Sequence, residues 1–323
     1  MAATTDARNT SASDTTARFR QSLAHDLAHP PLKLSGVELC GVWDSEVIRV
    51  AAEAPELLEN FPDLPIRIRG ALGWALEAVA NETPPRRRRH LSAYELLFKP
   101  IAERAPGLEI PKPLTLRAWV DKRLLTVELR LFGEAAACMP EAAEALVRTL
   151  EGGISLRTGG RQRVPVRVID VFGKTDCGVA VPRDGATMAV LRFRSPVTIR
   201  HKVSQASHAR LRAKDDARAI LNSIERRVAS LARWQMAELV EDKAILKAVI
   251  DELAVDETDM VPIPWVRHSV RQGNIGIPMQ GYVGTLRAVG RLGPLLPLLA
   301  LAAECNTGSH ASLGLGWFDL VVC

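Results

Sequence analysis

The sequence predicts an α+β protein built from two βαββαβ units in tandem, with a glycine-rich loop ahead of the last strand. Three observations predict this fold class. The chain has 323 residues, which is too long for one ordinary core and suits two domains of roughly 150 residues each. Strand-like and helix-like patterns follow the order βαββαβ over residues 34–172. The same order returns over residues 187–322.

Each element of the first unit has its own signal in the sequence. Residues 34–43 alternate apolar and polar side chains, as a half-buried strand does. The first helix ends before Pro84, and Gly152 stops the second helix. The expected elements are a strand at 34–43, a helix at 64–81, strands at 114–120 and 124–132, a helix at 141–150 and a strand at 163–172.

The second unit repeats this order with longer helices. Its expected elements are a strand at 187–200, a basic helix at 207–234, an acidic helix after it, strands at 261–270 and 277–289, a proline-started helix at 293–304 and a strand at 313–322. The order βαββαβ is that of a ferredoxin-like domain. We therefore expect two ferredoxin-like domains, at residues 34–180 and 181–323.

Residues 1–33 are expected to be a disordered tail and lead-in. The first 20 residues are rich in Thr, Ser and Ala, carry charges of both signs and lack apolar periodicity. No secretory signal opens the chain, and no apolar run reaches the ~18 residues of a membrane helix. The five cysteines are odd in number and scattered, so they suggest neither a disulfide framework nor a zinc pattern. These features favour a cytoplasmic protein with no membrane partner.

The charge of the chain has two explanations. The net charge is +5, and 33 of the 42 basic residues are arginine. Arginine binds phosphate through two parallel hydrogen bonds and stacks on bases, as a nucleic-acid partner requires. A GC-rich genome favours arginine codons and explains the same composition, and composition alone gives this explanation more weight. Residues 238–259 hold eight acids and only two lysines, so the rest of the chain is more basic than the total suggests.

A loop rich in glycine lies ahead of the last expected strand. It contains Gly308, Ser309, His310, Gly314 and Gly316. A dinucleotide-binding fingerprint places its glycines between an early strand and a helix. The glycines here follow a helix and open a strand, which excludes that type of site. Such a loop can bring backbone N–H groups close to a phosphodiester; the alternative is a tight turn that needs glycine for positive φ.

Four further motifs stand in order ahead of this loop. They are Arg69-Gly70-Ala71-Leu72-Gly73 at a helix start, Ser195-Pro196 with Arg200 at a strand end, Arg267, Ser269, Arg271 and Gln272 in one segment, and Gly281 with Gly284. Together with the loop, these motifs resemble the CRISPR-associated endoribonucleases of the RAMP superfamily, which process precursor CRISPR transcripts. The resemblance covers residues 34–323.

The resemblance implies a groove between two ferredoxin-like domains and metal-independent cleavage of CRISPR repeat RNA without a cofactor. The RNA's own 2′-hydroxyl attacks the phosphate and leaves a 2′,3′-cyclic phosphate, so the protein supplies positioning, proton transfer and positive charge. The implied partners are CRISPR precursor RNA, guide RNA and other CRISPR effector subunits. A non-catalytic RNA-binding subunit of the same superfamily, which scaffolds an effector complex, is the rival prediction.

The resemblance also implies a proton-transfer histidine shortly after the first helix. His90 fits this place, in a segment that also holds Tyr94 and Lys99. Four arginines beside His90 would attract phosphate and depress its pKa until RNA neutralises them; the alternative is a solvated basic loop. His310 competes for the same role. Residues 82–100 hold no cysteine, which argues against the zinc site of some relatives.

The catalytic candidates are therefore His90, Tyr94 and His310. The candidates for RNA binding are Arg67, Arg69, Arg86, Arg87, Arg88, Arg89, Lys99, Arg200, Arg267, Arg271, Gly308, Ser309, Gly314 and Gly316. An unrelated RNA-recognition domain would carry aromatic side chains on the central strands of its sheet. Aromatic residues make up only 5% of the chain, which disfavours that alternative.

Overall fold

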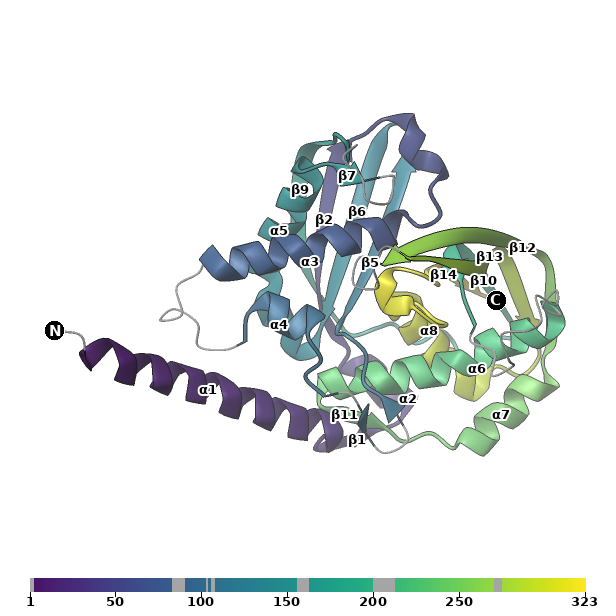
Figure 1. The fold of residues 1–323 in the computed structure, drawn as a ribbon. Helices are drawn as coiled ribbons and strands as arrows, with labels where there is room; N and C mark the ends of the chain where they lie inside the picture. The colour runs from purple at the N-terminus through teal and green to yellow at the C-terminus, as the bar shows by residue number, and fades with distance from the viewer. Residues whose placement is uncertain are drawn as a thin grey trace.

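Two four-stranded antiparallel sheets, one in each half of the chain, form the centre of the protein (Figure 1). The computed structural model describes residues 3–82, 91–102, 104–105, 108–155, 163–199, 213–269 and 275–323. None of the helices in these ranges is both long enough and apolar enough to cross a membrane.

The first sheet has the strand order β5-β6-β2-β9. Its strands are β2 (Asp44–Glu53), β5 (Leu114–Asp121), β6 (Leu124–Phe132) and β9 (Arg167–Cys177). Between them lie α3 (Leu64–Glu82), α4 (Ala93–Phe98) and α5 (Met139–Glu151), with two small hairpins formed by β3 (Arg104–Ala105), β4 (Leu108–Glu109), β7 (Ile154–Ser155) and β8 (Arg163–Val164). In order along the chain, the four main strands occupy the sheet as 2-3-1-4, with a helix after the first and the third.

The second sheet repeats this topology as β12-β13-β10-β14. Its elements are β10 (Met188–Val197), α6 (Ala213–Ala232), α7 (Lys243–Glu252), β12 (Ala254–Ser269), β13 (Ile275–Val289), α8 (Leu296–Cys305) and β14 (Phe318–Val322). The expected fold class, tandem ferredoxin-like units with a glycine-rich loop ahead of the last strand, is confirmed. The helix expected after α6 is α7, but it holds two lysines and two acids and is therefore not the acidic helix that was expected.

The first strand does not lie where the sequence pattern places it. Residues 34–43 contain a short helix, α2 (Gly36–Gly41), and the strand begins only at Asp44. Ser35 and Glu38 form a reciprocal capping box that starts this helix. The capping box favours a helix here, although the alternation of apolar and polar residues is typical of a strand. The expected strand at 34–43 is therefore wrong.

The expected disordered tail at residues 1–33 is also wrong for much of its length. The structure has a helix, α1 (Ala3–Ala28), and the strand β1 (Leu32–Leu34), which pairs in parallel with β11 (Ala237–Leu239). Leu23 and Leu27 are buried in the core. Arg233 donates hydrogen bonds to the carbonyls of Leu27 and Ala28 at 3.1 and 2.8 Å, which satisfies the end of this helix. These long-range contacts have no signal in the composition of the tail.

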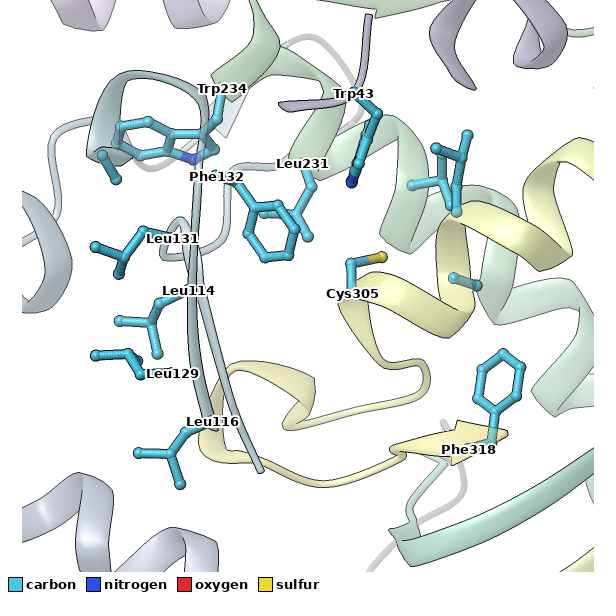
Figure 2. Packing of buried hydrophobic residues seen from close by; sticks show 14 of the residues in the cluster. Trp43, Leu114, Leu116, Leu129, Leu131, Phe132, Leu231, Trp234, Cys305 and Phe318 are labelled. Carbon is cyan, nitrogen blue, oxygen red and sulfur yellow. The ribbon is translucent and has the colours of Figure 1, made fainter. Parts of the chain in front are cut away.

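The two faces of the first sheet have different partners. Ile48 of β2 lies opposite Gly173 of β9, where a Cβ would collide with the Met139 side chain of α5, so helices cover this face. Figure 2 shows the leucines of β5 and β6 on that side, with Phe132 pointing the other way, toward Cys305. The other face therefore meets the second unit, and one continuous set of buried apolar side chains joins both halves.

Candidate functional site

The glycine-rich loop is held against the end of β10 by its main chain. Ser309 N–H donates to the carbonyl of Thr198 at 2.7 Å, and Gly316 N–H donates to that of Pro196 at 3.0 Å. The amide of Trp317 donates to Ser195 Oγ at 2.9 Å. The Ser195-Pro196 motif and the loop, more than a hundred residues apart in sequence, therefore form one local structure.

Gly281 brings a third motif to the same place. A Cβ on Gly281 would lie 2.9 Å from the Pro196 Cβ and 2.9 Å from the Val197 carbonyl oxygen. Only a residue without a side chain allows β13 to approach β10 this closely. Three motifs that are far apart in the sequence, Ser195-Pro196, Gly281 and the glycine-rich loop, therefore lie together around residues 195–198.

Two glycines of the loop serve contacts within the protein. Gly314 has φ +91, and a Cβ there would collide with Pro65 at the start of α3 and with the Leu116 carbonyl of β5. Gly316 has φ +70 and lies against the Thr307 carbonyl. Their amides donate to Ala311 O and Pro196 O, each at 3.0 Å. The loop is therefore one place where the second unit touches the first. RNA contact by these two glycines stays a prediction.

A row of charged side chains crosses the face of the first sheet that meets the second unit. Arg49, Glu128 and Arg117 lie directly opposite one another on β2, β6 and β5. Glu128 pairs with Arg49 at 2.7 Å and with Arg117 at 3.3 Å. Arg130, also on β6, pairs with Glu304 of α8 at 2.8 Å. These ion pairs tie the sheet to the end of α8, just ahead of the glycine-rich loop.

Arg117 binds the C-terminal end of α8 directly. Its guanidinium donates to the carbonyls of Ala303 and Glu304 and to Asn306 Oδ1 at 3.3 Å. A cation at this end of a helix is favourable, because the last carbonyls lack partners within the helix. Burial lowers the pKa of Arg117, and the charge of Glu128 offsets part of this effect. The guanidinium stays charged in either case, since its ordinary pKa is far above neutrality.

Glu128 should make the stability of the protein depend on pH in the acid range. Burial alone would raise the pKa of Glu128, but the charges of Arg117, Arg49 and Arg130 outweigh it and hold the pKa below its ordinary value. The stabilisation is therefore complete above the unfolded pKa of about 4.3 and is lost as pH falls through the lower folded pKa. We expect the urea midpoint to fall more steeply below about pH 4.3 in the wild type than in Glu128→Gln. Equal slopes would contradict this role of Glu128.

Aromatic side chains also meet at the junction of the two units. The rings of Trp119 and Trp317 lie 5.1 Å apart, and the Arg117 guanidinium lies 5.5 Å from the Trp317 ring. The central strands present Ser45, Val47, Arg49, Thr126, Glu128 and Arg130 on this face. The one aromatic side chain that these two strands place on this face, Phe132 at the end of β6, is fully buried, so it cannot stack a base as the aromatic side chains of an RNA-recognition sheet do.

His310 sits at the turn of the loop, in a conformation rare for a residue with a side chain. Its φ is +64, in the left-handed region, which costs about 1 kcal/mol or more outside glycine. It begins the short 3₁₀ turn η7 (Ala311–Leu313), and Leu313 N–H donates to its carbonyl at 2.8 Å. Its ring Nδ1 lies 3.4 Å from Thr198 Oγ1.

Tyr94 and Lys99 lie in another place. They belong to α4 and the residue after it, where Lys99 Nζ lies 5.2 Å from the Tyr94 ring centre. α4 meets α3 at Gly73, whose missing Cβ makes room for Phe98. Since the loop meets α3 at Pro65, eight residues earlier, the two contact points are about 12 Å apart along the helix. The described residues therefore do not bring Tyr94 next to His310.

Of the remaining basic candidates, three lie within the described residues. Arg67 is engaged within its own unit, with Asp63 at 2.9 Å and the Ser155 carbonyl at 3.1 Å. Arg69 lies over the Phe98 ring at 4.7 Å. Arg267 is half-buried on an arm of β12 and β13 that extends past Tyr282, the last partner of β10. Arg86, Arg87, Arg88, Arg89, His90, Arg200 and Arg271 lie outside the described residues.

Three residues of the site were not predicted from the sequence: Arg117, Thr198 and Trp317. Arg117 stands at one polar position of an alternating strand, and its partners on α8 lie nearly 190 residues further on. Thr198 stands beside the Ser195-Pro196 motif but is not part of it. Within the described ranges, no three His, Cys, Asp or Glu side chains group in a way that could hold a metal ion.

The fold is similar to that of solved Cas6 structures. A Cas6 product complex superposes with a TM-score of 0.52 at 18% sequence identity, over 86% of this chain and 99% of the other. A second Cas6 product complex gives 0.49 at 17% identity, over 87% and 100% of the two chains. The product of a Cas6-related gene from Pyrococcus furiosus gives 0.45 at 13% identity, over 85% and 98%.

Comparison of sequences adds one match, in the second unit. No curated protein matches the chain by sequence. Residues 191–318, which run from β10 through the glycine-rich loop into β14, match the family model of the CRISPR-associated endoribonuclease Cas6. The resemblance to CRISPR-associated endoribonucleases, predicted from the motifs of the chain, is thereby confirmed over residues 191–318.

Proposed function

We propose that the chain is a metal-independent endoribonuclease that binds and cleaves CRISPR repeat RNA to produce guide RNAs. The match of residues 191–318 to the Cas6 family carries this proposal. The clustering of Ser195-Pro196, Gly281 and the glycine-rich loop supports it, because three of the motifs that resemble the family meet at the end of β10, and the loop among them contacts the first unit through Gly314.

The proposed reaction needs little from the protein. The 2′-hydroxyl attacks the adjacent phosphorus, the bond to the 5′-oxygen breaks, and a 2′,3′-cyclic phosphate results. The protein has to align the attack, take the proton from the 2′-oxygen and return one to the 5′-oxygen. We propose His310 and His90 as the two candidates for this proton transfer, with Tyr94 as a further candidate. His310 is supported by its place where the two units meet.

Cleavage of repeat RNA tests the reaction itself. We expect cutting to persist in EDTA, to yield a 2′,3′-cyclic phosphate and to stop when the nucleotide ahead of the cut lacks its 2′-hydroxyl. Binding of the deoxy-substituted RNA should be retained, because only the nucleophile is removed. Cleavage of that RNA would rule out the mechanism. Tight binding of natural repeat RNA without any cleavage would support the non-catalytic subunit instead.

Two alanine variants separate the candidate histidines. If His310 transfers the proton, His310→Ala should slow single-turnover cleavage by about 10²–10⁴-fold and leave RNA affinity nearly unchanged. His90→Ala should then cut at close to the wild-type rate. The reverse pattern would assign the role to His90, and normal cutting by both variants would exclude histidine as the proton-transfer group.

The basic candidates predict a dependence of RNA binding on salt. Each neutralised phosphate releases counterions, so affinity should fall steeply as salt rises. Replacing Arg86, Arg87, Arg88 and Arg89 by alanine should weaken binding and flatten the slope of log affinity against log salt. The slope should change by about 0.7 for each phosphate of single-stranded RNA that the variant no longer neutralises. Fluorescence anisotropy at four salt concentrations measures this slope. An unchanged slope would show that the four arginines do not bind RNA.

A further inference from the structure

Thr198 occupies a fixed position between the end of β10 and the glycine-rich loop. The residue is 5% exposed, and its main chain forms an antiparallel bridge with Ser309. The Thr198 carbonyl accepts from Ser309 N–H at 2.7 Å. Gly281 faces its methyl group, with the position of a Cβ 3.2 Å from Thr198 Cγ2. Packing on the methyl side directs the hydroxyl toward the loop.

The hydroxyl of Thr198 has one hydrogen and two neighbours. Thr198 Oγ1 lies 2.5 Å from the Ser309 carbonyl oxygen and 3.4 Å from His310 Nδ1. A carbonyl oxygen can only accept, so the Thr198 hydrogen belongs to the bond with Ser309. Toward His310 the same oxygen can then only accept. Nδ1 must therefore be the protonated nitrogen if the two groups are bonded, and Nε2 carries the lone pair of the neutral ring.

We propose that Thr198 is the positioning residue that holds His310 in the Nδ1–H tautomer, with Nε2 as its basic nitrogen. The role in cleavage rests on the proposed function above. In that reaction Nε2 takes the proton of the 2′-hydroxyl as the 2′-oxygen bonds to phosphorus. The resulting imidazolium gives a proton to the 5′-oxygen as its bond to phosphorus breaks. A partner at Nδ1 fixes the tautomer and ring orientation that such a step requires.

The chain offers two matched substitutions at this position. Thr198→Val keeps the shape and the methyl contact with Gly281 but removes the hydroxyl. Thr198→Ser removes the methyl group and keeps the hydroxyl. Thr149→Val is the control, because Thr149 is a buried threonine whose hydroxyl donates to the Ala145 carbonyl on α5, away from His310.

The ring nitrogens of His310 report the tautomer directly. In the full chain labelled with ¹⁵N-histidine, at a pH where His310 is neutral, we expect two-bond ¹H–¹⁵N spectra to show the Nδ1–H form in the wild type, Thr198→Ser and Thr149→Val. Thr198→Val should shift the population to Nε2–H. An Nε2–H ring in the wild type, or an unchanged spectrum in Thr198→Val, would overturn the proposal. If Thr198→Val fails to fold, the wild-type and Thr198→Ser spectra still decide the tautomer.

Cleavage then tests whether the tautomer matters to the reaction. We expect Thr198→Val to slow single-turnover cleavage by at least about tenfold without a change in RNA affinity, and Thr198→Ser to restore most of the rate. Full activity in Thr198→Val, together with a slow His310→Ala, would overturn the positioning role. Wild-type activity in His310→Ala would instead refute the proposed role of His310 in cleavage, and the spectra would still decide the tautomer separately.

Discussion

Replacing Gly316 by alanine is expected to destabilise the protein by about 3 kcal/mol or more. The residue has φ +70, and the new Cβ would collide with the carbonyl oxygen and carbon of Thr307. These are main-chain atoms, which cannot turn aside as the end of a flexible side chain can. Thr307 N–H also donates to the Gly316 carbonyl at 3.0 Å, so the two sides of the loop cannot separate without breaking this bond. Urea denaturation followed by tryptophan fluorescence measures the change in stability.

Gly70 is the matched control for this substitution. It lies within α3, is exposed, and has no atom within 4 Å of an added Cβ. Gly70→Ala should therefore raise stability by about 0.5–1 kcal/mol, because alanine favours the helix. The sequence alone suggests that bulky residues at Gly314 or Gly316 abolish RNA binding in a folded protein. Wild-type stability of Gly316→Ala without RNA binding would support that view and contradict the packing role.

Replacing Arg117 by methionine is the second change with a large expected effect, a destabilisation of about 3 kcal/mol. Methionine fills much of the space but leaves the carbonyls of Ala303 and Glu304 without their donor. It also removes one cation from the buried Glu128. Lysine should not restore stability, because a single ammonium cannot replace the planar fork that reaches α8 and Glu128 together.

The control for Arg117 is an arginine in an exposed ion pair. Arg194 bonds Asp319 at 2.6 Å, but both side chains are largely exposed, and such pairs contribute little. Arg194→Met should leave the urea midpoint close to the wild-type value. If Arg117→Met behaves in the same way, the bonds between the first sheet and α8 do not hold the two units together.

The sequence predicted the regular elements well where the local pattern was strong. Residues 124–132 form β6 with the expected bounds, and 114–120 lie within β5. The helix at residues 36–41 was missed because its capping box lies within the segment 34–43, whose alternation of apolar and polar residues is also typical of a strand. The helix in the expected tail was missed because its buried end depends on Arg233, more than 200 residues away.

The sequence predicted which segments of the chain form the site, but it did not predict which side chains contact one another there. The motifs located the end of β10, Gly281 and the glycine-rich loop, which the fold brings together. The partners of Arg117 and Thr198 depend on the tertiary arrangement, so no local pattern could identify them. Some of the arginines also have a structural role that composition could not reveal. Arg117, Arg227 and Arg233 are buried and bind the ends of helices.

The contact of Gly314 with Pro65 and Leu116 limits how the two halves of such a protein can be exchanged. In a chimera that takes its second unit from a relative, the glycine-rich loop would have the shape that fits the first unit of that relative and not the first unit of this chain. The chimera would work only if the start of α3 and the middle of β5 came with the loop. The two ferredoxin-like units therefore have to be exchanged together, although each has the complete topology of a separate domain.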